Sequence, residues 1–313
     1  MSHATATKTA AKKPAKKKVS AFSTRKVDPA YYWMVVPAAI IFAFFLYLPF
    51  LDGVKYSFTN SQGYGDYKFI GLKNYIDLFQ DEKFIRAMLN TFVLVLVTVP
   101  AVTLFSLWVG ASIYQMRSGL RSFFRCVFYL PVVTGTVAVV VVWKWMFDAY
   151  NGIFNYILKA AGLIENNIMW LGDKRFAIWC IILIMFTTYV GQPIVLYVAA
   201  LGNVDVSLVE AAKVDGATDL QVFWKIKWPQ IMPTTLYIVV ITTINTFQCF
   251  SLIQLLTSGG PEGSTNTVMY YLYQNAFQLY KYGYANAMGV ILAIIIAILS
   301  AIQFKVMSKD VSY

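Results

Sequence analysis

The chain has little of what most catalytic and metal sites are built from. Among its 313 residues there is one histidine, His3, and there are three cysteines, Cys126, Cys180 and Cys249. A single histidine cannot supply a histidine-based metal site, and the sequence offers no plausible Ser-His-Asp or Cys-His arrangement. The cysteines fall within apolar runs, where we expect them to pack as small hydrophobic residues. The G-x4-GK-[ST] pattern of a nucleotide-binding P-loop is absent, so no catalytic residue, metal site or nucleotide cofactor is expected in this chain.

Charge is also scarce, whereas long apolar runs are plentiful. Charged residues make up 13% of the chain and hydrophobic residues 58%, with a mean hydropathy of +0.59. A helix needs about 20 residues to cross the hydrocarbon layer, and six uncharged runs reach that length without the alternation of a β-barrel strand. The sequence therefore predicts an all-α membrane protein with six transmembrane helices. The expected spans are about 31–51, 88–115, 123–146, 176–201, 232–256 and 284–306.

The distribution of basic residues predicts the topology. Residues 1–27 hold eight Lys/Arg and no acid, which places the N-terminus in the cytoplasm by the positive-inside rule. Six spans return the C-terminus to the same side. The loop 52–86 departs from the rule, because it is expected outside yet carries five Lys/Arg. We expect residues 1–28 to form a disordered basic tail and 29–313 the membrane domain. The net charge of +11 then reflects topology and attraction to membrane lipid, not nucleic-acid binding.

The spans carry uncharged polar residues but almost no ionisable ones. An ion-coupled carrier usually needs titrating groups in the bilayer interior. Hydroxyls and amides near aromatic rings suit an uncharged, hydroxyl-rich solute such as a sugar, although the same residues also join helices to one another or bond their own helix. The candidate residues for a substrate path are Thr136, Thr187, Tyr189, Gly191, Gln192, Thr242, Asn245, Thr246 and Gln248.

A polar segment, 205–229, interrupts the apolar runs. Asp205 or Ser207 is suited to cap a short helix, and Gly216 permits a turn with positive φ. A second short helix is expected from Thr218 to Lys227, ending before Pro229. The segment is therefore predicted to be a cytoplasmic helix-turn-helix between two spans.

Within it, the string Glu210-Ala211-Ala212-Lys213-Val214-Asp215-Gly216-Ala217 resembles the EAA loop of bacterial ABC importer permeases. Thr257-Ser258-Gly259-Gly260-Pro261, with the Thr, Tyr and Ala-Phe residues of 265–277, is similar to a signature of maltose/oligosaccharide-type carbohydrate permeases, and of the "F-type" subunit in particular. Together with shorter likenesses at Phe69–Tyr75 and at Leu130-Pro131, these cover nearly all of residues 35–305. The resemblance implies that the ATPase-coupling residues are Glu210, Ala211, Ala212, Asp215 and Gly216.

The resemblance also implies the type I ABC importer permease fold, with cytoplasmic coupling helices, and a set of partner proteins. It would pair with a second, related permease subunit in the bacterial plasma membrane, dock on two ATPase domains, and receive a carbohydrate from an extracellular sugar-binding protein. ATP and Mg²⁺ would be bound by the partner ATPase, so this chain would be no enzyme and would need no cofactor. Two alternatives stay open. One is an ion-coupled carrier of a small polar solute, since sodium sites can use carbonyls and hydroxyls. The other is a membrane scaffold that transports nothing.

Overall fold

The computed structural model describes residues 29–307, and every regular element among them is a helix. The basic tail expected at 1–28 lies outside these residues, as do 308–313. An isolated β-bridge joins Thr59 to Phe69 in the loop after α2. The elements are α1 Pro29–Phe42, π-helix η1 Ala43–Tyr47, α2 Leu48–Tyr56, α3 Lys73–Gln80, α4 Glu82–Tyr114, α5 Ser118–Val133, α6 Thr136–Met146, α7 Ile153–Ala160, α8 Ala177–Tyr189, α9 Gly191–Gly202, α10 Val206–Val214, α11 Asp219–Val222, π-helix η2 Phe223–Lys227, α12 Trp228–Phe247, α13 Ser251–Leu256, α14 Val268–Tyr273, π-helix η3 Gln274–Gln278 and α15 Tyr282–Met307.

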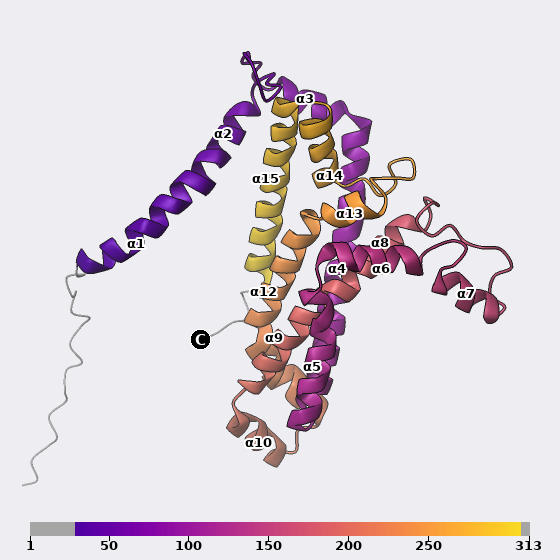
Figure 1. Cartoon of the computed structure of the whole chain (residues 1–313). Helices are drawn as coiled ribbons and strands as arrows, with labels where there is room; N and C mark the ends of the chain where they lie inside the picture. The colour runs from indigo at the N-terminus through magenta and orange to yellow at the C-terminus, as the bar shows by residue number, and fades with distance from the viewer. Residues whose placement is uncertain (1–28, 308–313) are drawn as a thin grey trace, which may run out of the picture. The chain divides into compact units, whose positions relative to one another are not determined.

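Among the described residues, 51–307 form one compact unit that is organised around α4. This helix runs for 33 residues and packs against α8, α9 and α12. Close approach to α9 depends on Gly110, where an added β-carbon would lie 2.8 Å from Cβ of Tyr197. In Figure 1, α10 lies at one end of the bundle, and α3 and α14 lie at the other. We refer to these as the α10 end and the α3 end.

Four helical stretches among the described residues are long and apolar enough to cross a membrane. They are Trp33–Tyr56, Glu82–Tyr114, Ala177–Gly202 and Tyr282–Met307. The expected span 123–146 is not one straight helix, because α5 and α6 meet at an angle of 96°. Thr134 and Gly135 adopt extended backbone angles between them, which interrupts the helical hydrogen bonds. Counted as one, the bent pair makes a fifth crossing.

The expected span 232–256 is also divided. Helix α12 ends at Phe247, and α13 begins at Ser251. Between them, Thr267 donates its hydroxyl to the carbonyl of Cys249 at 3.1 Å, so the backbone oxygen freed by the break is satisfied by a side chain from the loop before α14. Irregular backbone at membrane depth is tolerated when protein groups satisfy it in this way.

At the α3 end, one carboxylate holds three helices together. Asp81 precedes α4 and accepts a hydrogen bond from the amide of Lys83 at 2.9 Å, which caps the helix. Its other oxygen, Oδ2, accepts from the hydroxyls of Tyr271 on α14 (2.6 Å) and Tyr284 on α15 (2.8 Å). Partial burial raises the pKa of Asp81, but the tyrosine and backbone hydrogen bonds outweigh it and leave the pKa below its ordinary value.

Candidate functional site

A cavity of about 210 Å³ lies between α5, the junction of α8 with α9, and α12. Four of the nine candidate path residues line it: Tyr189, Gln192, Thr242 and Asn245. Tyr189 and Gln192 come from the junction of α8 with α9, and Thr242 and Asn245 come from α12, so packing brings together two parts of the chain. The lining holds hydroxyls, amides and aromatic rings and no charged side chain. The remaining lining residues are Val132, Thr188, Pro193, Leu196, Tyr237, Ile238 and Ile241.

Gly191 shapes this cavity without lining it. A β-carbon added at Gly191 would lie 2.7 Å from Cγ2 of Val132 and still closer to the carbonyl oxygen of Phe128. Real carbon atoms do not approach a backbone so closely, so any side chain here would separate α9 from α5. The prediction that Gly191 contacts substrate therefore receives no support from its position, and the geometry gives it a packing role.

Four other candidates lie away from the cavity. Thr246 is fully buried and donates to the carbonyl of Thr242 at 2.7 Å, and Thr187 donates to the carbonyl of Ile184 at 2.9 Å. Both hydroxyls bond within their own helices, the alternative that the sequence left open for threonines. Thr136 is exposed at the start of α6, and Gln248 is exposed just after α12.

A second hollow of about 530 Å³ shares Gln192 and Leu196 with the first. Its other lining residues are Ser122, Arg125, Cys126, Tyr129 and Val195. The two hollows are therefore adjacent along α5 and α9. The α5 residues were not among the predicted path residues, although Ser122, Cys126 and Tyr129 recur at helical spacing on one face. Arg125 is the charged residue of the second hollow.

The polar segment forms two short helices at the α10 end. Asp205 caps α10 by accepting from the amide of Ser207 at 2.9 Å, and the Ser207 side chain and amide keep the pKa of Asp205 below its ordinary value. Gly216 turns the chain with φ of +82°. Thr218 and Gln221 form a capping box that starts α11. The helix-turn-helix predicted from the sequence thus has the expected cap at Asp205 and the expected turn at Gly216, and Thr218 supplies a second cap that was not predicted.

The residues proposed for coupling present an accessible face. Glu210, Ala211, Asp215 and Gly216 are exposed, and Ala212 is half-buried. Lys213 forms an ion pair with Asp219 at 3.1 Å that joins α10 to α11. A surface pair of this kind contributes about 0–1 kcal/mol, so it adjusts the geometry of the segment and does not hold it folded.

One expectation for this segment is wrong. The second helix does not end before Pro229, because η2 runs directly into α12 with helical backbone at Lys227 and Trp228. Pro229 lies in the first turn of α12, after the wider π-helical turn of 223–227. A proline within a helix removes one backbone hydrogen bond and crowds the preceding turn. A π-helical insertion relieves that crowding and is common at functional sites.

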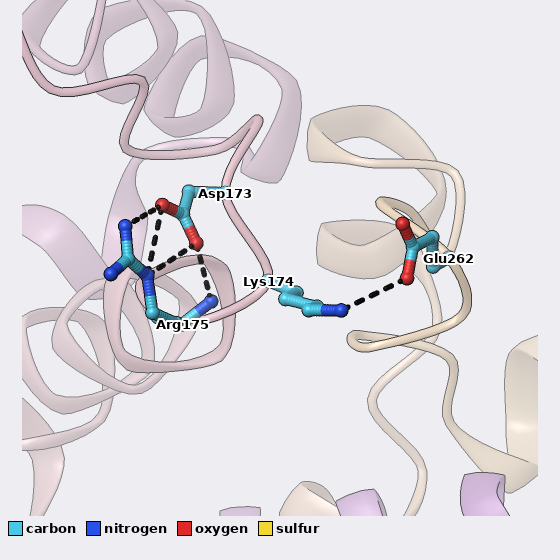
Figure 2. A network of polar contacts seen from close by, with 4 residues as sticks. All are labelled: Asp173, Lys174, Arg175 and Glu262. Carbon is cyan, nitrogen blue, oxygen red and sulfur yellow. Dashed lines mark hydrogen bonds and ion pairs between the residues drawn. The ribbon is translucent and has the colours of Figure 1, made fainter.

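The loops at the α3 end are tied by polar contacts, as Figure 2 shows. Lys174, which precedes α8, pairs with Glu262 in the loop before α14 at 3.2 Å. Next to it, the hydrogen bond from the Arg175 side chain lowers the pKa of Asp173 to about 2. The Lys174–Glu262 pair is largely exposed, so its role is to orient the two loops and not to stabilise the bundle.

Residues 79–309 match the family described as binding-protein-dependent transport system inner membrane component. The chain is 33% identical over 295 residues to the probable ABC transporter permease protein YesP of Bacillus subtilis, covering 93% of this chain and 94% of that protein. It is 32% identical over 295 residues to the multiple sugar-binding transport system permease protein MsmF of Streptococcus mutans, covering 91% and 98%.

Solved structures show the same likeness. A chain of a bacterial alginate ABC transporter, solved with its alginate pentasaccharide-bound periplasmic protein, gives a TM-score of 0.76 at 28% identity over 90% of this chain and 94% of that one. The MetNI methionine transporter shares the fold alone, with a TM-score of 0.54 at 15% identity. The present chain belongs to the family of binding-protein-dependent transport system inner membrane components. It is a helical membrane protein that serves as a transport subunit, and it is not an enzyme.

Proposed function

We propose that this chain is the permease subunit of an ATP-driven, binding-protein-dependent carbohydrate importer. The observation that carries the proposal is the agreement between the relatives and the cavity. Sugar permeases such as MsmF align over more than nine-tenths of both chains, and the cavity beside Gln192 offers hydroxyls, amides and aromatic rings without charge. Such a lining matches a hydroxyl-rich solute, because each buried hydroxyl of the substrate then finds a hydrogen-bond partner.

The proposed function also implies the partner proteins. The exposed α10–α11 segment docks on an ATPase, which binds ATP and Mg²⁺. A second permease subunit completes the translocation path. A binding protein meets the loops at the α3 end. The existence of such a partner is supported by the related alginate transporter, which was solved in complex with a periplasmic protein. This arrangement puts the α10 end and both termini in the cytoplasm and the α3 end outside.

The docking assignment is tested by affinity capture of this chain in mild detergent, co-expressed with the products of its neighbouring genes. An ATPase is expected to co-purify with the wild type, and Glu210→Lys is expected to lose it, because the substitution reverses the charge on the exposed face of α10. Lys174→Glu, at the opposite end, is the matched control and should retain the ATPase. If no ATPase accompanies the wild-type chain, uptake without an ATPase partner becomes the better explanation, as for an ion-coupled carrier.

The substrate path is tested at two neighbouring residues of α12. Asn245→Leu is expected to slow uptake of labelled di- to pentasaccharides about tenfold, because losing one well-placed hydrogen bond in the path costs about 1.4 kcal/mol. Thr246→Val should change the rate less than about twofold, because its hydroxyl bonds only its own helix. Equal effects of the two substitutions on the uptake rate would remove Asn245 from the path.

A further inference from the structure

One tyrosine ring touches both ends of residues 205–227, which we call the coupling segment. Tyr114 is the last residue of α4. A β-carbon added at Gly202, the last residue of α9, would lie 3.8 Å from Cε2 of Tyr114, so the ring lies against the backbone where the chain enters the segment. On the exit side, Nζ of Lys227 lies 5.7 Å from the centre of the same ring. The ring is therefore a shared contact for the two stems of residues 205–227.

The same ring also holds the start of α5. The guanidinium of Arg121 lies 5.4 Å from the ring centre, and its Nη2 donates to the carbonyl of Met116 at 3.1 Å, in the turn between α4 and α5. A cation within about 6 Å of an aromatic face is attracted by the ring quadrupole, more strongly when both are partly desolvated. Tyr114, Arg121 and Lys227 are all half-buried, which strengthens the attraction relative to a fully exposed pair.

Apolar packing reinforces this junction. Tyr114 packs on a buried cluster built from α4, α9 and α12, which includes Leu107, Leu201 and Ile231. Val209 of α10 and Phe223 of η2 pack on the same cluster. A displacement of the coupling segment therefore presses on side chains that belong to the path helices, and the ring of Tyr114 is the element that contacts both stems and α5 together.

We propose that Tyr114 is a positioning residue that transmits movement of the coupling segment to α4 and α5. The proposal rests on the proposed function, since it assigns the segment at 205–227 as the place where an ATPase acts. Helix α5 supplies Val132 to the substrate cavity and Arg125 and Tyr129 to the adjacent hollow. When the segment moves, both cations move with the ring, and the start of α5 follows. The aromatic face is the required feature, because no hydrogen bond of the Tyr114 hydroxyl occurs within residues 29–307.

The test compares Tyr114→Phe, which keeps the aromatic face, with Tyr114→Leu, which removes it. In the purified importer complex, amide hydrogen exchange in 205–227 is expected to be about tenfold faster in Tyr114→Leu and unchanged in Tyr114→Phe. Adding ATP with orthovanadate is expected to alter exchange in both 205–227 and the first turns of α5 in the wild type and in Tyr114→Phe. In Tyr114→Leu the response should be confined to 205–227. Amides of α14 serve as the internal control.

A second pair of variants tests the proposal without changing position 114, where a substitution could impair folding. Lys227→Met is expected to reproduce the loss of response in α5, whereas Lys225→Met, two residues away and exposed, should not. An α5 response that survives in Tyr114→Leu, or that is lost equally in Tyr114→Phe, overturns the proposal. If the proposed function is wrong, the result is different, because no ATPase co-purifies with the wild type. Amide hydrogen exchange of residues 205–227, compared between Tyr114→Leu and Tyr114→Phe in the chain alone, then still decides whether the ring tethers the segment.

Discussion

Gly191→Ala is expected to destabilise the membrane domain by about 3 kcal/mol, at the upper end of the usual cost of overpacking. The new methyl group would meet the backbone of Phe128 and the side chain of Val132. Neither can rotate away, because one atom is a helix carbonyl and the other is on a β-branched residue that is stiff in a helix. Relief requires α5 to move off α9, which also widens the cavity beside Gln192. The measurement is the thermal unfolding midpoint of the purified protein in detergent.

Gly119→Ala is the matched control, because it makes the same change on α5 where nothing lies within 4 Å of the added carbon. Alanine is the better helix former by about 1 kcal/mol, so this variant should be as stable as the wild type or slightly more stable. An unfolding midpoint for Gly191→Ala within 1 °C of the control would mean that the two helices do not pack as closely as the structure has them.

The sequence predicts most of the fold because hydropathy, helix caps and turn residues act locally along the chain. The apolar runs predict where the long helices lie. Asp205 and Gly216 predict the first cap and the turn of the coupling segment, since each acts on its own neighbours in the chain. Both residues occupy the roles expected of them.

The breaks could not be predicted from hydropathy. The runs around Thr134 and Gln248 contain no charged residue, and whether a helix continues there depends on distant partners such as Thr267, which bonds the freed carbonyl of Cys249. Pro229 was misjudged for a related reason. A proline predicts a helix end only when the preceding turn is α-helical, and here the π-helical turn of 223–227 accommodates it.

Which polar residues face the cavity was also only partly predictable. Thr242 and Thr246 lie one turn apart and were both predicted to line the path, yet only Thr242 lines the cavity. A threonine can bond its own helix and thereby leave the path at no cost in hydrogen bonding, whereas the longer amides of Gln192 and Asn245 reach outward. Sequence spacing gives the face of a helix but does not reveal whether a hydroxyl is already satisfied.

Asp81→Ala is expected to cost about 3 kcal/mol and to loosen the α3 end. Losing the helix cap costs about 1 kcal/mol. Hydrogen bonds to a charged group contribute about 1.5–3 kcal/mol each. The two from Tyr271 and Tyr284 should each contribute less than this, because Asp81 is only partly buried and solvent weakens the interaction. The three contacts tie α4 to helices that lie 190 and 203 residues away in the chain. The measurement is again the unfolding midpoint, with Asp77→Ala on the exposed face of α3 as the matched control.

The cost of Asp81→Ala should depend on pH in one direction. The pKa of Asp81 in the folded protein is lowered from its ordinary value of 3.8. The folded state therefore favours the ionised carboxylate over the protonated acid. The stabilisation is therefore complete above about pH 5, and it is lost as the pH falls below 4 and through the lowered pKa. The difference in unfolding midpoint between wild type and Asp81→Ala should be constant from pH 5 to 7 and shrink below pH 4. A difference that stays constant down to pH 3, or one no larger than that of Asp77→Ala at pH 7, would show that the carboxylate does not hold the three helices together.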